Sequence, residues 1–427
     1  MVMVTLKLMI INSNFDLLPH PSAQRIALRV TPAAERALRQ GHPWVFDQAI
    51  TEQNRPGASG DLAVIFDDKR HFMAIGLYDP ASPIRVRILQ AGQPATINQD
   101  WFQARLLNSY QERSAFQSQP ENRATTGYRL VHGENDGFPG LVIDRYADTL
   151  VLKMYTPAWI PYLREFLPAL AQVSPAERLI LRLSRSFTRQ TDTLHGLSDG
   201  MLLTGTLPDS PLLFKENGLT FETDPIHGQK TGFFLDQRDN RARVERLAQD
   251  KLVLNLFAYT GGFSVYAVRG GAKEVVSVDI SAPALQASIR NMAYNQQSPA
   301  IAAASHQTIA RDVFEVLTDL HESNRHFDLV VIDPPMFAQN QSQIAAALSA
   351  YRRLTHLGLA VLRSGGTLVQ ASCSSRIDAP TFFDTVNQAA RAAGRPLHEL
   401  ERTGHALDHP IRFKEGAYLK CLFAIAP

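Results

Sequence analysis

Three potentially catalytic or ligand-binding side chains occupy equivalent positions, at the ends of predicted strands, in the second half of the chain. Asp279, Asp333 and Cys373 each end or follow a short apolar run that predicts a buried strand. A cysteine thiolate can add to C6 of a pyrimidine, which makes C5 nucleophilic, and a nearby carboxylate can hold the base or act on the C5 proton. We therefore expect Cys373 to be a catalytic nucleophile and Asp333 its partner. The alternative for Cys373 is a small buried apolar side chain, which we expect for Cys421.

A glycine turn between two predicted strands indicates a nucleoside-binding site. The order strand, turn, helix and strand is given by residues 251–257, by Tyr259-Thr260-Gly261-Gly262, by residues 263–269 and by residues 274–279. Backbone N–H groups of such a turn face the ligand, and the acid that ends the second strand, Asp279, can bind the ribose hydroxyls. Asp312, after the next predicted strand, can accept from an adenine amino group. For both acids the alternative is a helix N-cap.

The spacing of the glycines bears on which nucleoside binds. A dinucleotide fingerprint has the form G-x-G-x-x-G, whereas here only Gly261 and Gly262 are close together and no basic residue is placed to bind a pyrophosphate. This favours a ligand with adenine and ribose but no phosphates, such as S-adenosylmethionine. A dinucleotide, and with it an oxidoreductase, is a weaker alternative, as is an ordinary glycine-rich turn without a ligand.

Strand and helix patterns alternate from residue 239 to the end of the chain, which predicts a doubly wound α/β domain. Residues 302–309 read as a weak strand, residues 327–333 as an apolar strand, and Gly365-Gly366 as a turn before a strand at residues 367–371. Ligands of such sheets bind beyond the carboxyl ends of the strands. The two aspartates and the cysteine described above are all expected at that edge.

Composition and charge limit the class of protein. A length of 427 residues predicts two or three domains, and a net charge of +2 gives no overall field for nucleic acid, so any RNA contact must come from local patches. Two cysteines exclude a disulfide framework and a Cys-rich metal site, so we expect no metal and a cytoplasmic location. No apolar run approaches the roughly 18 residues of a membrane span. Residues 1–24 are predicted to be an N-terminal extension rather than a signal peptide.

The first half of the chain suggests two further domains. Residues 25–95 predict a compact β-rich barrel, either a nucleic-acid-binding module or a purely structural domain, in which Trp44 and Phe46 are expected in the core. Residues 96–215 predict a central α+β domain. It holds the densest basic patch, formed by Arg178, Arg182, Arg185 and Arg189, which reads as a phosphate-binding face or as an ordinary solvated sheet face.

The loop that follows residue 332 allows a second chemistry. Asp333-Pro334-Pro335 could hold an exocyclic amine for direct N-methylation, which needs no cysteine. In either chemistry the base must leave its stack at a cost of a few kcal/mol, so looped or single-stranded RNA suits the site better than a closed duplex. A third alternative is an RNA-binding or assembly factor that keeps the cofactor fold without turnover.

These motifs together resemble the RlmI-like family of class I S-adenosylmethionine-dependent ribosomal RNA methyltransferases, which modify cytosine C5 in large-subunit RNA. The similarity runs through nearly the whole chain after about Arg25. The motifs that carry it are His42-Pro43-Trp44-Val45-Phe46, Arg129-Leu130-Val131-His132-Gly133-Glu134, Gln229-Lys230-Thr231-Gly232-Phe233-Phe234-Leu235-Asp236-Gln237-Arg238, Phe257-Ala258-Tyr259-Thr260-Gly261-Gly262, Asp333-Pro334-Pro335, Ser372-Cys373-Ser374 and Glu415-Gly416-Ala417-Tyr418-Leu419-Lys420.

The resemblance implies a fold and a set of site residues. The expected fold is a PUA-like barrel (residues 25–95), a central α+β domain (96–215) and a Rossmann-like methyltransferase domain with a mostly parallel seven-stranded sheet (216–427). The implied cofactor residues are Asp236, Asn255, Phe257, Tyr259, Thr260, Gly261, Phe263, Asp279, Asp312 and Asp333. The implied RNA contacts are Lys230, Arg182, Arg185, Pro334 and Pro335. RNA is the expected partner, and the sequence leaves a homodimer open.

The chain departs from the family pattern at three places. Met336 stands where lysine is usual, Lys414 where proline is usual, and Ser375-Arg376 follow the cysteine motif where a second small residue or histidine is common. The missing lysine beside Asp333 bears on the identity of the RNA site and of the base, and not on the fold or the cofactor.

Overall fold

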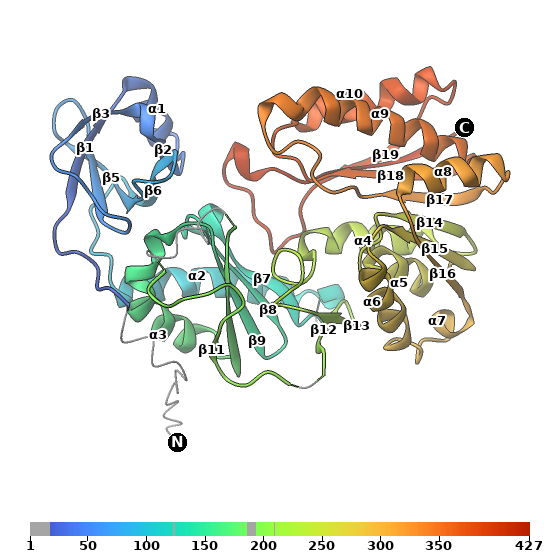
Figure 1. Cartoon of the computed structure of the whole chain (residues 1–427), viewed down its shortest axis with the longest axis horizontal. Coiled ribbons are helices and arrows are strands. Elements are labelled where there is room, and N and C mark those ends of the chain that lie inside the picture. Colours follow the sequence, from blue (N-terminus) through green and yellow to red (C-terminus); the bar gives the residue numbers. More distant parts are fainter. Residues whose placement is uncertain (1–17, 123, 186–193, 209) are drawn as a thin grey trace. The chain divides into compact units, whose positions relative to one another are not determined.

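The computed structural model describes residues 18–122, 124–185, 194–208 and 210–427. The described chain forms two compact units (Figure 1). The first comprises the chain up to Gly218 together with Thr223–Phe233 and Asp408–Phe413, and the second comprises Leu219–Glu222, Phe234–Leu407 and Lys414–Pro427. The predicted extension falls outside the described residues as far as residue 17. Among the described helices, none is long and apolar enough to cross a membrane.

The β-rich part of the first unit is a sheet with the strand order β2-β6-β5-β4-β1-β3. Its elements are β1 (Ile26–Val30), α1 (Pro32–Arg39), β2 (Trp44–Phe46), β3 (Ile50–Gln53), β4 (Leu62–Phe66), β5 (Phe72–Tyr78) and β6 (Ile84–Ala91). Alternation along β2 buries Val45 and leaves Phe46 45% exposed. The expectation that Phe46 lies in the core is therefore wrong, because its neighbour points inward instead.

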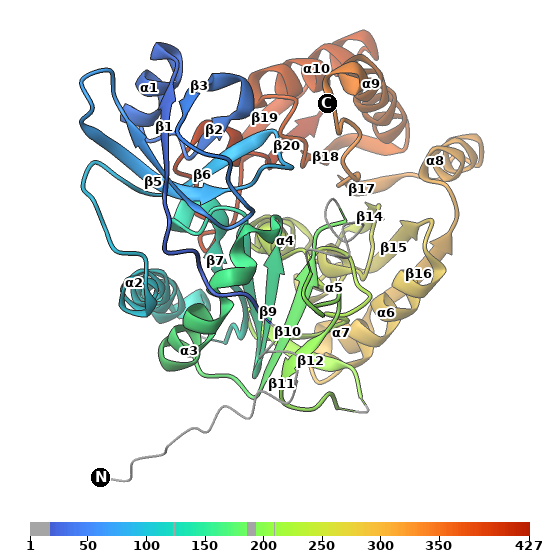
Figure 2. The ribbon, with the colours of Figure 1, turned by 60° about the vertical axis from the view of Figure 1, so that its left-hand side comes forward.

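The central part of the first unit is a second sheet, of order β11-β10-β9-β8-β7, with α2 and α3 lying side by side (Figure 2). Its elements are α2 (Gln99–Ser118), β7 (Gly127–His132), β8 (Leu141–Tyr146), β9 (Thr149–Met154), α3 (Leu163–Val173), β10 (Arg178–Leu183) and β11 (Leu202–Thr204). From the sequence, Trp159–Leu170 reads as a helix opened by Pro157 and Pro161, whereas α3 begins only at Leu163. Pro157 and Pro161 shape a 3-10 turn before it, since proline removes the N–H that an α-helix interior needs.

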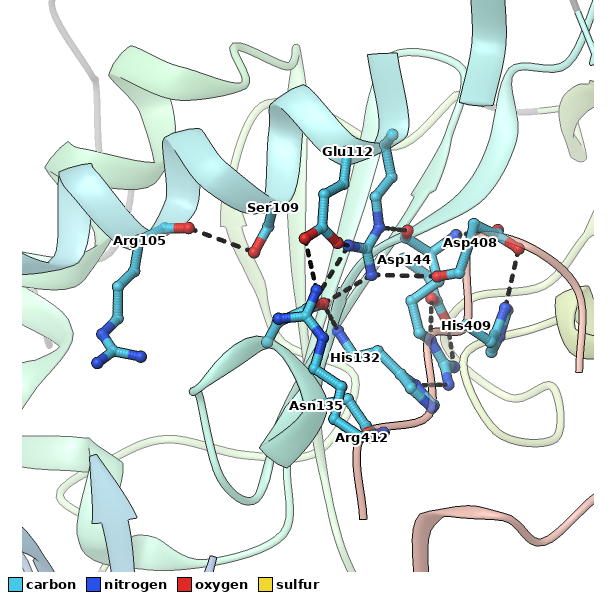
Figure 3. Close-up of polar contacts among 12 residues, drawn as sticks. Arg105, Ser109, Glu112, His132, Asn135, Asp144, Asp408, His409 and Arg412 are labelled. Atoms are coloured by element: carbon cyan, nitrogen blue, oxygen red, sulfur yellow. Dashed lines mark hydrogen bonds and ion pairs between the residues drawn. The ribbon is translucent and has the colours of Figure 1, made fainter. Parts of the chain in front are cut away.

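A buried ion-pair network holds the segment Asp408–Phe413 against this central sheet (Figure 3). Arg113 donates to both carboxylate oxygens of Asp136 at 3.2 and 2.6 Å and to the backbone oxygen of Asp408 at 3.1 Å. Arg129 donates to the carboxylate of Asp144 at 2.8 and 2.9 Å, and its backbone N–H donates to the Asp408 carboxylate at 2.8 Å. Buried charges are costly unless they are paired, and the two ion pairs meet this requirement. The hydrogen bonds to Asp408 join the late segment to α2 and β7.

The second unit contains, within the described residues, a seven-stranded sheet of order β16-β15-β14-β17-β18-β20-β19. Its strands are β14 (Leu252–Leu256), β15 (Glu274–Asp279), β16 (Ser305–Ala310), β17 (Phe327–Ile332), β18 (Leu362–Ser372), β19 (His398–Thr403) and β20 (Lys420–Ala426). The pairs formed by β14 to β18 are parallel, and β20 is antiparallel to both its neighbours. The predicted Rossmann-like, mostly parallel seven-stranded fold is confirmed.

Helices cover both faces of this sheet, with α4, α5, α6 and α7 on one side and α8, α9 and α10 on the other (Figure 1). The helices are α4 (Arg238–Leu247), α5 (Gly262–Arg269), α6 (Ala282–Ala293), α7 (Pro299–Ala303), α8 (Val313–Glu322), α9 (Ile344–Ala360) and α10 (Ala379–Ala392). Just before α4, β12 (Leu212–Glu216) and β13 (Leu219–Thr223) form the hairpin that Glu216-Asn217-Gly218 predicts.

Two local expectations in this sheet are wrong. Gly365-Gly366 is not a turn but lies within β18, where Gly365 has a φ of +74° and the register against β17 shifts nearby. The glycines thus supply a strand irregularity that other residues accommodate poorly. The strand predicted at residues 302–309 begins only at Ser305, because Pro299 first starts the short helix α7.

Candidate active site

The carboxyl edge of the parallel strands gathers the residues that carry the chemistry. Asp279 is the last residue of β15, Asp333 follows β17 and Cys373 follows β18. These strands and β14 are parallel neighbours, so their carboxyl ends lie at one edge of the sheet. The prediction that the three residues lie at this edge is confirmed.

The turn between β14 and α5 is held in a strained conformation. Phe257 and Tyr259 have φ values of +58° and +48°, in the left-handed region that bulky residues rarely adopt, and Gly261 has a φ of +78°. Asp279 keeps the turn in place because its Oδ2 accepts from the backbone N–H of Tyr259 at 2.8 Å. The side chain of Asn291 donates to the backbone oxygen of Thr260 at 2.9 Å. Such strain persists only where the surroundings enforce it, and it clusters at ligand sites.

Asn255, one of the implied cofactor residues, supports this turn from beneath. Its side-chain amide is buried and donates to Ser264 Oγ at 2.8 Å. Ser264 in turn contacts Ser277 Oγ at 2.7 Å, and Ser277 contacts His306 Nε2 at 2.8 Å. Burial lowers the pKa of His306 to about 4, so the imidazole is neutral near pH 7. Phe263 is also buried. Asn255 and Phe263 are thus both buried next to the turn, and their contact with the cofactor stays a prediction.

The remaining groups fit a nucleoside ligand. Asp279 accepts one backbone N–H on each carboxylate oxygen, from Tyr259 and Ser281 at 2.8 Å each, and each oxygen keeps a further lone pair for a ribose hydroxyl. Gly261 is the N-cap of α5 and brings no capping side chain, so the first N–H groups of this helix lack an internal acceptor. This donor and acceptor set matches an adenosine-type ligand without phosphates.

Asp312 is the N-cap of α8. Its Oδ1 accepts from the backbone N–H groups of Phe314 and Glu315 at 2.9 and 3.3 Å, and the residue is exposed. The N-cap alternative is confirmed. Contact of the same carboxylate with an adenine amino group stays a prediction.

The beginning of α4 brings polar side chains to Asp333. Gln237 is buried and donates from Nε2 to Asp333 Oδ1 at 2.9 Å. Just before it, the buried Asp236 accepts from the hydroxyl of Tyr418 at 2.8 Å, so its carboxylate holds the chain that leads into β20. Sequence reasoning did not assign Gln237 a role, although it lies in the most distinctive motif of the chain. The cofactor contact implied for Asp236 stays a prediction.

Cys373 lies against the loop that follows β17. Its Sγ is 3.9 Å from the backbone oxygen of Pro334, and the residue is half-buried. Cys421, in contrast, is fully buried within β20, where burial raises the pKa of its thiol far above the usual value. The structure therefore separates the two cysteines as expected, with only Cys373 partly open to solvent. Among the described residues, no cluster of three or more His, Cys, Asp or Glu side chains could hold a metal ion.

The residues that the resemblance implies as RNA contacts differ in their exposure to solvent. Arg182 is buried and donates to Asp199 Oδ1 at 3.0 Å and to the backbone oxygen of Pro225 at 2.8 Å. Its guanidinium holds a loop inside the first unit, which corrects the expectation of a solvated or phosphate-binding face. Arg185 is exposed, and Arg189 falls outside the described residues. Pro335 is exposed whereas Pro334 is buried.

Lys230 and the residue that follows it both contact the central sheet of the first unit. Its backbone has a φ of +54°, and its carbonyl oxygen accepts from Lys153 Nζ at 2.9 Å. The next residue, Thr231, donates to the buried Asp144 carboxylate at 2.5 Å. Burial lowers the pKa of Lys153 to about 8, with the positive charge of Arg182 as the next cause. The motif around Lys230 is thus anchored to the central sheet by the backbone of Lys230 and the hydroxyl of Thr231.

The sheet order and the residues at its carboxyl edge define a Rossmann-like α/β domain that binds a nucleoside. Residues 199–424 match the family described as S-adenosylmethionine-dependent methyltransferase, and residues 28–91 match a PUA-like domain. The chain belongs to the S-adenosylmethionine-dependent methyltransferases, and within them to the RlmI-like family. Its cofactor is S-adenosylmethionine.

Named relatives and solved structures agree with this assignment. A "Ribosomal RNA large subunit methyltransferase" of Deinococcus radiodurans is 47% identical over 406 residues, covering 95% of this chain and 98% of the relative. A "Ribosomal RNA large subunit methyltransferase I" of Pseudoalteromonas translucida is 37% identical over 399 residues, covering 93% and 98%. A solved Streptococcus mutans chain described as a SAM-dependent methyltransferase has a TM-score of 0.79 at 23% identity, covering 93% and 99%, which shows the shared fold.

Proposed function

We propose that this protein forms 5-methylcytosine in large-subunit ribosomal RNA through a covalent bond between Cys373 and C6 of the base. The relatives named above supply the RNA class. The observation that carries the chemistry is the 3.9 Å approach of Cys373 Sγ to the backbone oxygen of Pro334, which sets the thiol directly beside the loop that starts with Asp333. With ribosomal RNA as substrate, the protein would act in the cytoplasm.

The proposed reaction takes place at C5 and C6 of the cytosine ring. The thiolate of Cys373 adds to C6, and the electron pair of the C5–C6 double bond moves to C5. Bound S-adenosylmethionine would supply an electrophilic methyl group to C5; the bond between this methyl and the sulfonium breaks, its electron pair goes to sulfur, and S-adenosylhomocysteine is the leaving group. Loss of the C5 proton then restores the double bond and expels the thiolate. In this proposal Asp333 holds the base at its N3 and N4 side or accepts the C5 proton.

The RNA must present an unstacked cytosine, because neither C5 nor C6 is accessible to a protein inside a duplex. We propose Pro335 and the neighbouring Met336, which is 44% exposed, as surface against which the extruded nucleotide packs. Arg185 is exposed and Lys230 half-buried, and both remain proposed phosphate contacts. Arg182 is not among the proposed RNA contacts, because its guanidinium donates to Asp199 and to the backbone oxygen of Pro225.

The test uses Cys373→Ala with labelled methyl donor and ribosomal RNA, with Cys421→Ala as the matched control. We expect Cys373→Ala to lose C5 methylation and Cys421→Ala to keep it. RNA that carries 5-fluorocytidine has no C5 proton to lose, so the wild type should form a stable protein–RNA adduct that Cys373→Ala cannot form. Unchanged 5-methylcytosine in the Cys373→Ala product would remove the covalent mechanism.

A second candidate, N-methylation, is favoured by the same Asp333-Pro334-Pro335 loop. In that reaction Cys373 is dispensable, so Cys373→Ala would still transfer the methyl group. Digestion of the RNA to nucleosides followed by mass spectrometric fragmentation distinguishes a methyl on the exocyclic nitrogen from one on C5. A protein without turnover, acting as an assembly factor, would give no labelled RNA with either variant or with the wild type.

A further inference from the structure

Lys420 is a buried lysine that the proposed reaction has not used. It is the first residue of β20 and lies opposite Ser372 in the antiparallel pairing with β18, one position before Cys373. Only 2% of its surface is exposed. Its Nζ donates to the backbone oxygens of Ser374, of Ile377 at 2.6 Å and of Tyr418 at 3.1 Å. The ammonium group therefore lies beneath the loop that begins with the nucleophile.

The partners of this ammonium group are carbonyl oxygens rather than carboxylates. Within the part of the chain that the structure describes, no carboxylate lies at ion-pair distance from Lys420 Nζ. A buried cation without a counter-ion is costly, and burial lowers the pKa of Lys420 to about 8. The charges of Cys373 and Asp378 act in the opposite direction, so the thiol lies within electrostatic range of the ammonium. Lys420 is still mostly protonated at pH 7.

We propose that Lys420 is a positioning residue for Cys373. Its contacts to the carbonyl oxygens of Ser374 and Ile377 fix the loop after the nucleophile, and its charge stabilises the Cys373 thiolate. The effect of the Lys420 charge on the pKa of the Cys373 thiol does not depend on the reaction. The effect of Lys420 on methyl transfer rests on the proposed function. Lys420 stays protonated throughout the reaction. It favours the thiolate both before addition to C6 and after its expulsion, and no proton passes between them.

Three further titratable groups on neighbouring elements, Tyr351, Asp333 and Asp378, bear on the charge of the Cys373 thiol. Burial raises the pKa of Tyr351 on α9 well above its usual range, so its hydroxyl is neutral and donates or accepts at Ser372 Oγ over 2.8 Å. Asp333, beyond β17, is a carboxyl group. Hydrogen bonds from Thr381 lower the pKa of Asp378 ahead of α10 and keep it anionic. Negative charge from these acids opposes a thiolate, whereas the positive charge of Lys420 favours it.

The direct test measures how fast iodoacetamide alkylates Cys373 as a function of pH, without RNA. The Cys421→Ala background makes the reaction report one thiol, since the sequence has two cysteines. We expect an apparent thiol pKa below the 8.5 of a free cysteine in this background. Lys420→Met should raise it by about one unit and slow alkylation at pH 7 about tenfold, because the rate follows the thiolate fraction. Lys420→Arg should restore most of the shift by keeping the charge.

The matched control is Lys414→Met, which removes a positive charge from an exposed lysine close in sequence. It should leave the alkylation profile unchanged. If Lys420→Met also leaves the profile unchanged, the proposal is overturned. Should Lys420→Met fail to fold, as judged by loss of S-adenosylmethionine binding, a pKa of 8.5 or above in the Cys421→Ala protein overturns it instead. The alkylation result does not require methyl transfer, so failure of the covalent mechanism would show separately, as C5 methylation that survives in Cys373→Ala.

Discussion

Gln237 Nε2 lies 2.9 Å from Asp333 Oδ1 and donates a hydrogen bond to it. The amide of Gln237 is itself oriented, because Asn240 Nδ2 donates to its Oε1 at 2.6 Å and Thr403 Oγ1 donates to the Oδ1 of Asn240 at 2.6 Å. A relay of three polar side chains therefore runs from β19 through α4 to the carboxylate beside the proposed nucleophile. Its consequence is one preferred orientation for Asp333.

Gln237→Leu should slow methyl transfer by removing this orientation while keeping a side chain of similar size. A hydrogen bond to a charged group contributes about 1.5–3 kcal/mol, so we expect kcat/KM to fall by about tenfold to a hundredfold. Single-turnover methylation of ribosomal RNA measures the loss. Gln296→Leu, at an exposed position after α6, is the control and should retain wild-type rates. Equal rates in both variants would show that Asp333 needs no such partner.

Asp312 offers a way to separate capping from ligand binding. Asparagine is as good an N-cap as aspartate, so Asp312→Asn should leave the free energy of unfolding within about 0.5 kcal/mol of the wild type, whereas Asp312→Ala should lower it by about 1 kcal/mol. If the carboxylate also binds adenine, both variants weaken S-adenosylmethionine binding in calorimetric titration. Unchanged affinity in Asp312→Asn would leave the residue with its capping role alone.

Gly261 is required by its conformation and by its neighbour. Its φ is +78°, and a Cβ added there would lie 2.0 Å from Ser288 Oγ on α6. Gly261→Ala should therefore destabilise the second unit by about 1–3 kcal/mol in urea unfolding. Ser288→Ala removes the closest clashing atom, so the double variant should recover part of the loss and show coupling of at least about 0.5 kcal/mol. Strictly additive effects would mean that backbone strain alone makes the glycine necessary.

Much of the methyltransferase half could be predicted because its signals are local. The apolar run with paired valines that ends in Asp279 gave the bounds of β15, and parallel topology then required Asp279, Asp333 and Cys373 to share an edge. Gly261 and Gly262 likewise predicted the turn between β14 and α5 from adjacent residues alone. By contrast, the domain boundaries expected at residues 25–95, 96–215 and 216–427 stay predictions.

The features that sequence reasoning missed depend on contacts between distant segments. Lys420 reaches the Cys373 loop only because β20 pairs with β18, and nothing near Lys420 in the sequence announces that pairing. Arg182 was expected at a solvated or phosphate-binding face because it belongs to the densest basic patch, yet it is buried and donates to the backbone oxygen of Pro225. The segment Asp408–Phe413 joins the first unit through backbone and side-chain contacts to Arg129 and Arg113. Local patterns give no indication of such partners.

His306 makes the stability of the second unit depend on pH in a defined direction. Burial lowers the pKa of the folded-state imidazole to about 4, against about 6.5 when the chain is unfolded. The unfolded state therefore takes up a proton first as pH falls, and stability that is fully present above pH 6.5 is lost between pH 6.5 and 4. The pKa difference corresponds to a loss of up to about 3 kcal/mol from this residue.

The measurement compares urea unfolding of the wild type and of His306→Asn, followed by circular dichroism, between pH 4 and pH 7. Asparagine can still meet Ser277 Oγ but does not titrate, so the variant should be less sensitive to acid than the wild type. Carboxylates that titrate in the same range are common to both proteins and cancel in the difference. Parallel pH profiles would mean that the imidazole becomes protonated without leaving the Ser277 contact, and that the polar chain under the cofactor turn tolerates a charge.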